Sequence, residues 1–254
     1  MASITDCVSE GLKYPFNDVK KLLVLGAIFA LLNLATPVSL RFTHVPANSI
    51  YVMAALGIVS FIITLFVMGY QYDVVKFSID KREDLPGFTD IMNIFVKGIK
   101  ILIVAVAYNV IPAIVLIIGA FLAGDYTGPA VVVILISAIL FIIAFFLQIM
   151  AVNNMVANDS LGKAFDFRQI IDMISNLGWG KYIGIVLFTF IVLIIVNVAV
   201  GYILSFISLF IAIAANNAMI VSVLVGIIQG LFITSYTSLF YNRVCGSIYR
   251  EAIK

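Results

Sequence analysis

The stretch YIGIVLFTFIVLIIVNVAVGYILSFISLFIAIAANNAMIVSVLVGIIQGLFITSYTSLFYN, Tyr182–Asn242, runs for 61 residues without an Asp, Glu, Lys, Arg or His. About 20 apolar residues in an α-helix cross the hydrocarbon core of a bilayer, so this stretch is long enough for two crossings. Asn tolerates the left-handed backbone of a tight turn, which places the turn near AANNA, Ala214–Ala218. The stretch therefore predicts two transmembrane helices, 182–209 and 218–241.

The composition of the chain also indicates a membrane protein. Of the 254 residues, 63% are hydrophobic and 11% are charged, whereas soluble domains have about 25% charged residues. Acidic residues at positions 6, 10 and 18 precede the first apolar run, so we expect no cleavable secretory signal. Cys7 and Cys245 form no CxxC motif, so we expect neither a disulfide framework nor a cysteine-bound metal.

Further charge-free runs give the remaining crossings. With the pair above they predict an all-α protein, a bundle of six transmembrane helices in one membrane domain covering residues 1–254. The predicted spans are 20–40, 50–72, 101–123, 130–152, 182–209 and 218–241.

The Lys and Arg residues predict the orientation of these spans. Fourteen of the 15 lie before or at the start of the first span, after the last, or in the second-to-third and fourth-to-fifth connections. Arg41 alone lies on the other side. Cytoplasmic segments carry the excess of basic residues. We therefore expect a plasma-membrane protein with both termini, including the tail 242–254, in the cytoplasm.

One polar segment, LPGFTDIMNIFVKGIK at Leu85–Lys100, separates the second and third spans. Its apolar face holds Phe88, Ile91, Met92, Phe95 and Ile99, and its polar face holds Asp90, Asn93, Lys97 and Lys100. This pattern predicts an amphipathic helix in the membrane interface at 87–100, with a solvated helix as the alternative. Similar patterns predict amphipathic helices at 3–14 and 165–178.

The three amphipathic segments suggest an internal repeat. Similar motifs, PFND at Pro15–Asp18, GFTD at Gly87–Asp90 and DFRQ at Asp166–Gln169, occur in or near them. One interpretation is three units, each an interfacial helix followed by a transmembrane hairpin. The alternative is a chance likeness produced by membrane-protein composition.

The stretch GYQYDVVKFSIDKREDLPGFTDIMNIFVKGIKILIVAVAYNVIP, Gly69–Pro112, resembles the domain-of-unknown-function 4013 family of polytopic membrane proteins, which are found mainly in archaea. The segments Glu10–Gly26 and Tyr241–Tyr249 are also similar to that family. The resemblance implies six helices and an archaeal plasma membrane. It implies no activity, cofactor or catalytic residue.

Two sets of residues within the predicted spans are candidates for a site or for helix packing. The candidates for a helix kink or a polar cavity are Asn109, Pro112, Gln148 and Gln229. A proline removes a backbone hydrogen bond, and transporters use broken helices as binding sites. The alternatives are a structural bend and amides that bond across helices.

The packing candidates are small or polar residues spaced four apart. They are Asn197, Gly201 and Ser205 in the fifth span, and Ser222, Gly226, Gly230, Thr234 and Ser238 in the sixth. Small residues let helices approach closely in lipid, so this stripe predicts face-to-face packing of the fifth and sixth spans. A homo-oligomer seam is the alternative.

The residues present favour some functions over others. The sequence shows no metal-ligand cluster and no nucleophile–base pair, so we expect no enzyme, no metal and no cofactor. Apart from Lys20 and Lys21 at the start of the first span, the spans contain no acid, Lys, Arg or His, which disfavours an ion-coupled carrier. We favour a non-enzymatic scaffold, accessory protein or organiser of lipid or of a membrane partner. A small permease or channel for an uncharged or weakly polar solute is the alternative. The expected partners are the bilayer and a membrane protein or second copy, with no nucleic acid.

Overall fold

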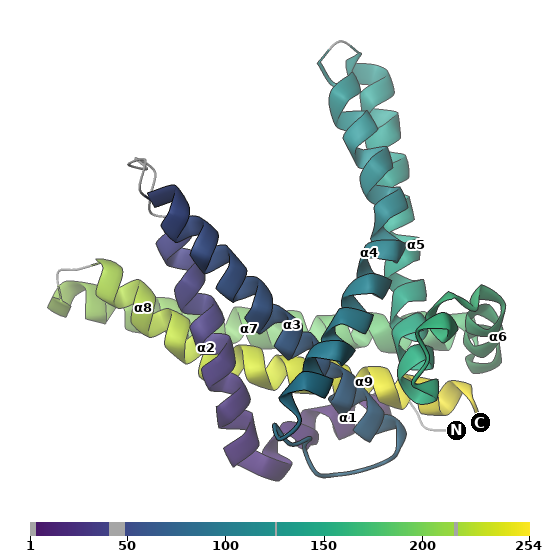
Figure 1. Cartoon of the computed structure of the whole chain (residues 1–254), viewed down its shortest axis with the longest axis horizontal. Coiled ribbons are helices and arrows are strands. Elements are labelled where there is room, and N and C mark those ends of the chain that lie inside the picture. Colours follow the sequence, from purple (N-terminus) through teal and green to yellow (C-terminus); the bar gives the residue numbers. More distant parts are fainter. Residues whose placement is uncertain (1–3, 41–48, 125, 216–217) are drawn as a thin grey trace.

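The computed structural model describes residues 4–40, 49–124, 126–215 and 218–254, and all regular structure among them is helical (Figure 1). The fold is therefore all-α. Three helical hairpins, here called the arms, dominate it. They pair α2 (Val19–Leu40) with α3 (Ser49–Ile79), α4 (Ile91–Leu122) with α5 (Thr127–Asn158), and α7 (Trp179–Ala215) with α8 (Ala218–Ile228).

The arms join a common region, here called the base. It consists of the short helices, α9 and the adjoining ends of the arms. The remaining elements are α1 (Ile4–Lys13), the 3-10 helices η1 (Tyr14–Asp18) and η2 (Leu161–Phe165), α6 (Phe167–Leu177), the π-helix η3 (Gln229–Thr234) and α9 (Ser235–Ala252). Helices α8, η3 and α9 follow one another without a break, and α1 packs on α9.

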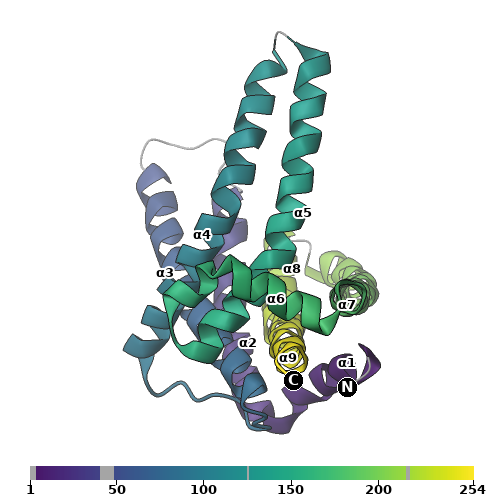
Figure 2. The ribbon, with the colours of Figure 1, turned by 90° about the vertical axis from the view of Figure 1, so that its right-hand side faces the viewer.

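The arms diverge from the base rather than packing side by side along their length, so the bundle is open. Helix α2 crosses α8 and η3, whereas the α4–α5 arm projects away from the other two arms in both views (Figures 1 and 2). Large apolar side chains on the projecting arm are consequently uncovered by the rest of the chain, and the side chain of Phe121 is 81% exposed.

Five helical runs in the described part of the chain are long and apolar enough to cross a membrane. They are Ile50–Ile79, Ile91–Leu122, Thr127–Asn158, Trp179–Ile211 and Val223–Ala252. The chain is thus a multi-pass membrane protein in contact with the lipid bilayer. The first predicted span, 20–40, corresponds to α2, whose side chains are described only as far as Leu34. The count of six therefore stays a prediction. Arg41 and part of the predicted turn at 214–218 lie outside the described residues.

The predicted interfacial helix at 87–100 is not a separate element. Residues from Ile91 onward are the first turns of α4, because no proline or loop interrupts the helix before the apolar run at 101–123. Lys97 forms an ion pair of 2.6 Å with Asp73 of α3, and Lys100 forms one of 2.8 Å with Asp159 after α5. The regularly spaced lysines therefore bind acidic residues of neighbouring helices.

The predicted tail, 242–254, is also different. It belongs to α9, which continues to Ala252 and is largely buried. Phe240, Val244 and Ile248 recur every four residues and are at most 1% exposed, so this face belongs to the core. The predicted span ends at 241, just before Arg243, yet Arg243 is only 4% exposed.

The related sequence motifs have a local explanation in helix capping. The side chains of Asp90 and Asp166 accept hydrogen bonds from the backbone N–H three residues ahead and cap α4 and α6. Asp18 accepts in the same way from Lys21 at the start of α2. Helices α1 and α6 agree with the predicted amphipathic helices 3–14 and 165–178, but the middle unit has no such separate helix. The threefold repeat remains a hypothesis.

Buried apolar side chains gather at the base. The larger cluster draws on α1, α3, α4, α5, α6, α7 and α9, and includes Met150, Ile174 and Tyr182. A smaller cluster joins η1, α2, α3 and α9 around Tyr70, whose ring stacks on Phe88 at 4.6 Å between centroids. The base therefore provides the core that fixes where the arms begin.

Candidate functional site

The structure brings together two of the four predicted cavity residues. The side-chain amide of Asn109 in α4 donates to the side-chain oxygen of Gln148 in α5 at 2.9 Å, and also to the carbonyl of Ala105 at 2.8 Å. This pair links the two helices of the projecting arm. Gln148 also lines a cavity at the base, whereas Asn109 does not.

Pro112 and Gln229 lie apart from that pair. Pro112 is buried inside α4, and its carbonyl accepts a hydrogen bond of 2.9 Å from Ser137 of α5. It lines a mainly apolar hollow of about 270 Å³ with Phe165 and Phe167. Gln229 lines a different hollow, between α7 and α8. The four residues therefore do not share one cavity.

The predicted glycine stripe packs against a different helix from the one expected. A Cβ on Gly230 would overlap the backbone of Ala30 in α2, and a Cβ on Gly226 would meet Asn33 of α2 at 3.6 Å. Asn33 also donates to the carbonyl of Gly226 at 3.1 Å. The prediction that these glycines face the fifth span is therefore wrong, because the closest approach is to the first.

The other stripe residues take several positions. Asn197, Gly201 and Ser205 of α7 line the hollow of about 220 Å³ opposite Gln229. Ser238 accepts a hydrogen bond of 3.0 Å from Gln71 of α3. Thr234 ends the π-helical segment that packs on α2. The side chain of Ser222 lies outside the described residues.

A cavity of about 190 Å³ lies where α3, α4, α5 and α9 meet, and we call it the neutral chamber. Its polar lining is uncharged and consists of Gln71, Gln148, Asn153, Tyr241, Asn242 and Cys245. Asn153 is fully buried and donates to the carbonyl of Cys245 at 2.8 Å. Its side-chain oxygen has no hydrogen-bond partner among the described residues. Since a buried acceptor without a donor is costly, this oxygen is an unsatisfied polar position beside the chamber.

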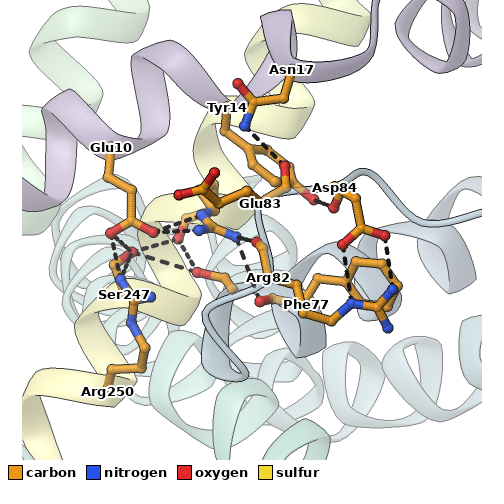
Figure 3. Close-up of polar contacts among 11 residues, drawn as sticks. Glu10, Tyr14, Asn17, Phe77, Arg82, Glu83, Asp84, Ser247 and Arg250 are labelled. Atoms are coloured by element: carbon orange, nitrogen blue, oxygen red, sulfur yellow. Dashed lines mark hydrogen bonds and ion pairs between the residues drawn. The ribbon is translucent and has the colours of Figure 1, made fainter.

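A charged network closes the other side of the base (Figure 3). Glu10 of α1 accepts from Arg243 of α9 at 2.7 Å, from Ser247 at 3.2 Å and from Arg250. Arg243 also donates to the carbonyl oxygens of Phe77, in the last turn of α3, and of Arg82, in the connection that follows α3. The network ties α1, α9 and the α3–α4 connection together.

Aromatic and backbone contacts complete this network. The guanidinium of Arg243 lies 4.5 Å from the ring centroid of Tyr14, whose hydroxyl donates to the carbonyl of Asp84 at 3.0 Å. The side chain of Asn17 donates to the carbonyl of Glu83 at 2.9 Å. Both contacts hold the α3–α4 connection against η1. A group that is deeply buried and multiply bonded, as Arg243 is, acts as a structural anchor.

A known protein family matches most of this chain. Residues 52–230 match the family described as Protein of unknown function (DUF4013). The chain belongs to this family. The matched region runs from α3 into η3, so it covers α4 to α8 and leaves out α1, η1, α2 and α9. No curated protein and no solved structure matches the chain.

In this DUF4013 protein, electrostatics at the base favour the charged forms of exposed acids. Arg82 donates to Asp84 at 2.8 Å, and this hydrogen bond holds the pKa of that carboxyl below its usual value. The hydrogen bond from Lys100, followed by that from Tyr72, lowers the pKa of Asp159. Burial raises the pKa of the Tyr14 hydroxyl, which therefore stays protonated.

Sequence reasoning missed the charged network and the neutral chamber. Arg243, Ser247 and Arg250 follow helical spacing on one face of α9, and that periodicity was the available signal. Their partner, Glu10, is more than 230 residues away in the chain, so no local pattern reveals it. Among the described residues no three His, Cys, Asp or Glu side chains gather as metal ligands.

Proposed function

We propose that this protein is a non-enzymatic scaffold of the membrane, which uses its α4–α5 arm to bind a membrane-embedded helical partner. This proposal rests on the difference in side-chain burial between the base and that arm. The base is packed and bonded across five or more elements, whereas the arm projects with apolar faces that nothing in the described chain covers.

The exposed side chains of the arm support a helical partner. Ile111, Ile114 and Ile118 lie on one side of α4 at spacings of three and four, and Leu135, Ile139 and Ile142 do so on α5; each is at least 50% exposed. Large aliphatic side chains in this register can interlock with those of another helix. In lipid, helices associate through dispersion contacts because there is no hydrophobic driving force between them. The shape of the interlocking surface therefore decides which partner helix fits.

The experiment is co-purification from native membranes in mild detergent. We expect a membrane protein to accompany the wild-type chain at a fixed ratio, and Ile139→Ala with Ile142→Ala to reduce that ratio. The matched control, Ile58→Ala with Ile62→Ala, changes two exposed isoleucines of the α2–α3 arm. An unchanged ratio in the α5 variant, or no protein at a fixed ratio with wild type, would contradict the proposal.

We also propose that the base faces the cytoplasm of the plasma membrane. The supporting observation is the distribution of basic residues, since Lys13, Lys81, Lys163, Arg243 and Arg250 belong to base elements. Both natural cysteines are buried, which lowers the background for labelling. A membrane-impermeant thiol reagent should label Tyr126→Cys in intact cells and leave Asp84→Cys unlabelled. The reverse result would overturn the orientation.

A second candidate function is passage of a small uncharged solute, and the neutral chamber favours it. Its amide and hydroxyl lining, with the unpartnered oxygen of Asn153, suits a solute that donates N–H or O–H hydrogen bonds. Flux of urea and glycerol into proteoliposomes tests this function. Flux that is abolished by Asn153→Leu would establish the transport function. Flux rates equal to those of protein-free vesicles would rule it out, and the scaffold function would then be the one proposed function that remains.

A further inference from the structure

A second polar cavity lies beside the charged network, on the open side of the base. It has a volume of about 340 Å³ and is lined by Glu10, Lys13, Tyr14, Asn17, Lys81, Glu83, Arg243 and Arg250. These residues come from α1, η1, the α3–α4 connection and α9, so three separate parts of the chain build the cavity. We call it the basic pocket.

The charges of the basic pocket do not balance. Four cationic side chains and two carboxylates line it, which leaves a net of two positive charges. Glu10 already binds both Arg243 and Arg250. Lys13 and Lys81 have no acidic partner among the described residues, and each is exposed. The two lysines are therefore available to an anion.

The donors left over in the pocket suit a phosphate group. Arg250 uses Nη2 for Glu10 and Ser247, and its Nη1 and Nε make no hydrogen bond among the described residues. A guanidinium fork and two ammonium groups around one cavity match the oxygens of a phosphate. Arg243, by contrast, is occupied by Glu10 and by two backbone carbonyls, so it contributes charge without contact.

The backbone conformation of Lys81 also indicates that a positive charge is needed at this position. Its φ is +58°, in the left-handed region where a helix end normally has glycine. The turn is closed by the backbone N–H of Arg82, which donates to the carbonyl of Phe77 at 2.9 Å. A lysine in this conformation costs about 1 kcal/mol relative to glycine, yet it lines the pocket.

We propose that the basic pocket binds a phosphate-bearing anion through Lys13, Lys81 and Arg250. The phosphate comes either from the headgroup of an anionic lipid or from a soluble phosphate ester. The pocket is built by base elements, and we propose that the base faces the cytoplasm beside the membrane, so both sources can reach it. Tyr14 and Asn17 fix the α3–α4 connection, and thereby the position of Lys81, through their bonds to Asp84 and Glu83.

The test uses the full chain in detergent micelles and isothermal titration calorimetry with three probes. They are phosphatidylglycerol, phosphatidylcholine and soluble glycerol phosphate. Binding of phosphatidylglycerol alone identifies a lipid headgroup site, and binding of glycerol phosphate as well identifies a site for soluble phosphates. Either result supports the proposal only if the variants described below change the measured binding affinity. Equal heats from phosphatidylglycerol and phosphatidylcholine, without binding of glycerol phosphate, would overturn it.

Three variants and a control make this test specific. Lys81→Gly removes a cation while relieving the left-handed backbone, so the protein should melt no lower than wild type and bind about tenfold more weakly. Lys13→Gln should weaken binding to a similar degree. Glu83→Gln removes an opposing carboxylate and should strengthen binding about threefold. Lys20→Ala, an exposed lysine outside the pocket, should change nothing. If the Lys13 and Lys81 variants bind as Lys20→Ala does, the pocket is not a phosphate site.

Discussion

The base and the α4–α5 arm both consist of helices, but they differ in how their side chains are packed and bonded. At the base, side chains such as Ile174 and Met150 are fully buried, and Arg243 crosses between elements far apart in sequence. In the arm, α4 packs on α5 and also on α3, but side chains near the end of α4, such as Phe121, are left uncovered. Stability is therefore concentrated in the base, and the arm is available to the membrane and its proteins.

The largest expected loss of stability comes from breaking the charged network. Arg243→Leu leaves Glu10 with Ser247 and Arg250 and leaves two backbone carbonyls without their donor. We expect it to lower the free energy of unfolding by about 3–5 kcal/mol. Arg82→Gln alters an exposed arginine of the same region, whose pair with Asp84 is about half exposed, and should cost about 0–1 kcal/mol. Denaturant unfolding in detergent compares them, and equal losses would show that Arg243 is no anchor.

Glycines at different distances from their neighbours give the next largest contrast. Gly230→Ala forces a methyl group into the backbone of α2 and should cost about 1–3 kcal/mol. Gly201→Ala adds the same group where nothing lies within 4 Å, so stability should stay the same or rise slightly. Thermal melts of the two variants test which helix η3 packs against. If Gly201→Ala alone lowered the melting temperature, the result would favour the original prediction that the fifth and sixth spans pack face to face.

The smallest expected effect concerns the ion pair between Lys100 of α4 and Asp159 at the end of α5. Asp159 has a left-handed backbone (φ 46°) that Asn tolerates, so Asp159→Asn removes charge without straining the turn. Because the carboxylate is largely exposed, we expect a loss of about 0.5 kcal/mol at neutral pH.

The pH dependence gives this substitution its own check. The pKa of Asp159 is lowered in the folded state, so its contribution is full above the unfolded pKa of about 3.9. It is lost as the pH falls through the lower, folded pKa. The difference between wild type and Asp159→Asn should therefore be constant from pH 5 to 8 and vanish well below pH 4. A difference that grows on acidification would contradict the assignment.

The sequence predicts local properties of this molecule better than its contacts. Apolar runs and the caps at Asp90 and Asp166 mark where helices lie, because both depend on residues a few positions apart. The position of Gly230 against Ala30 depends on contacts 200 residues apart, and the small-residue stripe fits several partners equally. The burial of Arg243 was missed for the same reason, since an arginine after an apolar run normally ends a span.

The central claim is that the α4–α5 arm projects from a fixed base and is covered by the membrane and a partner. A photoreactive phenylalanine at position 121, introduced in native membranes and followed by mass spectrometry, tests it most directly. We expect cross-links to lipid or to another protein, while the same group at Phe240 cross-links only within the chain. Cross-links from position 121 to the α2–α3 or α7–α8 arm would show instead that the arms close into one bundle.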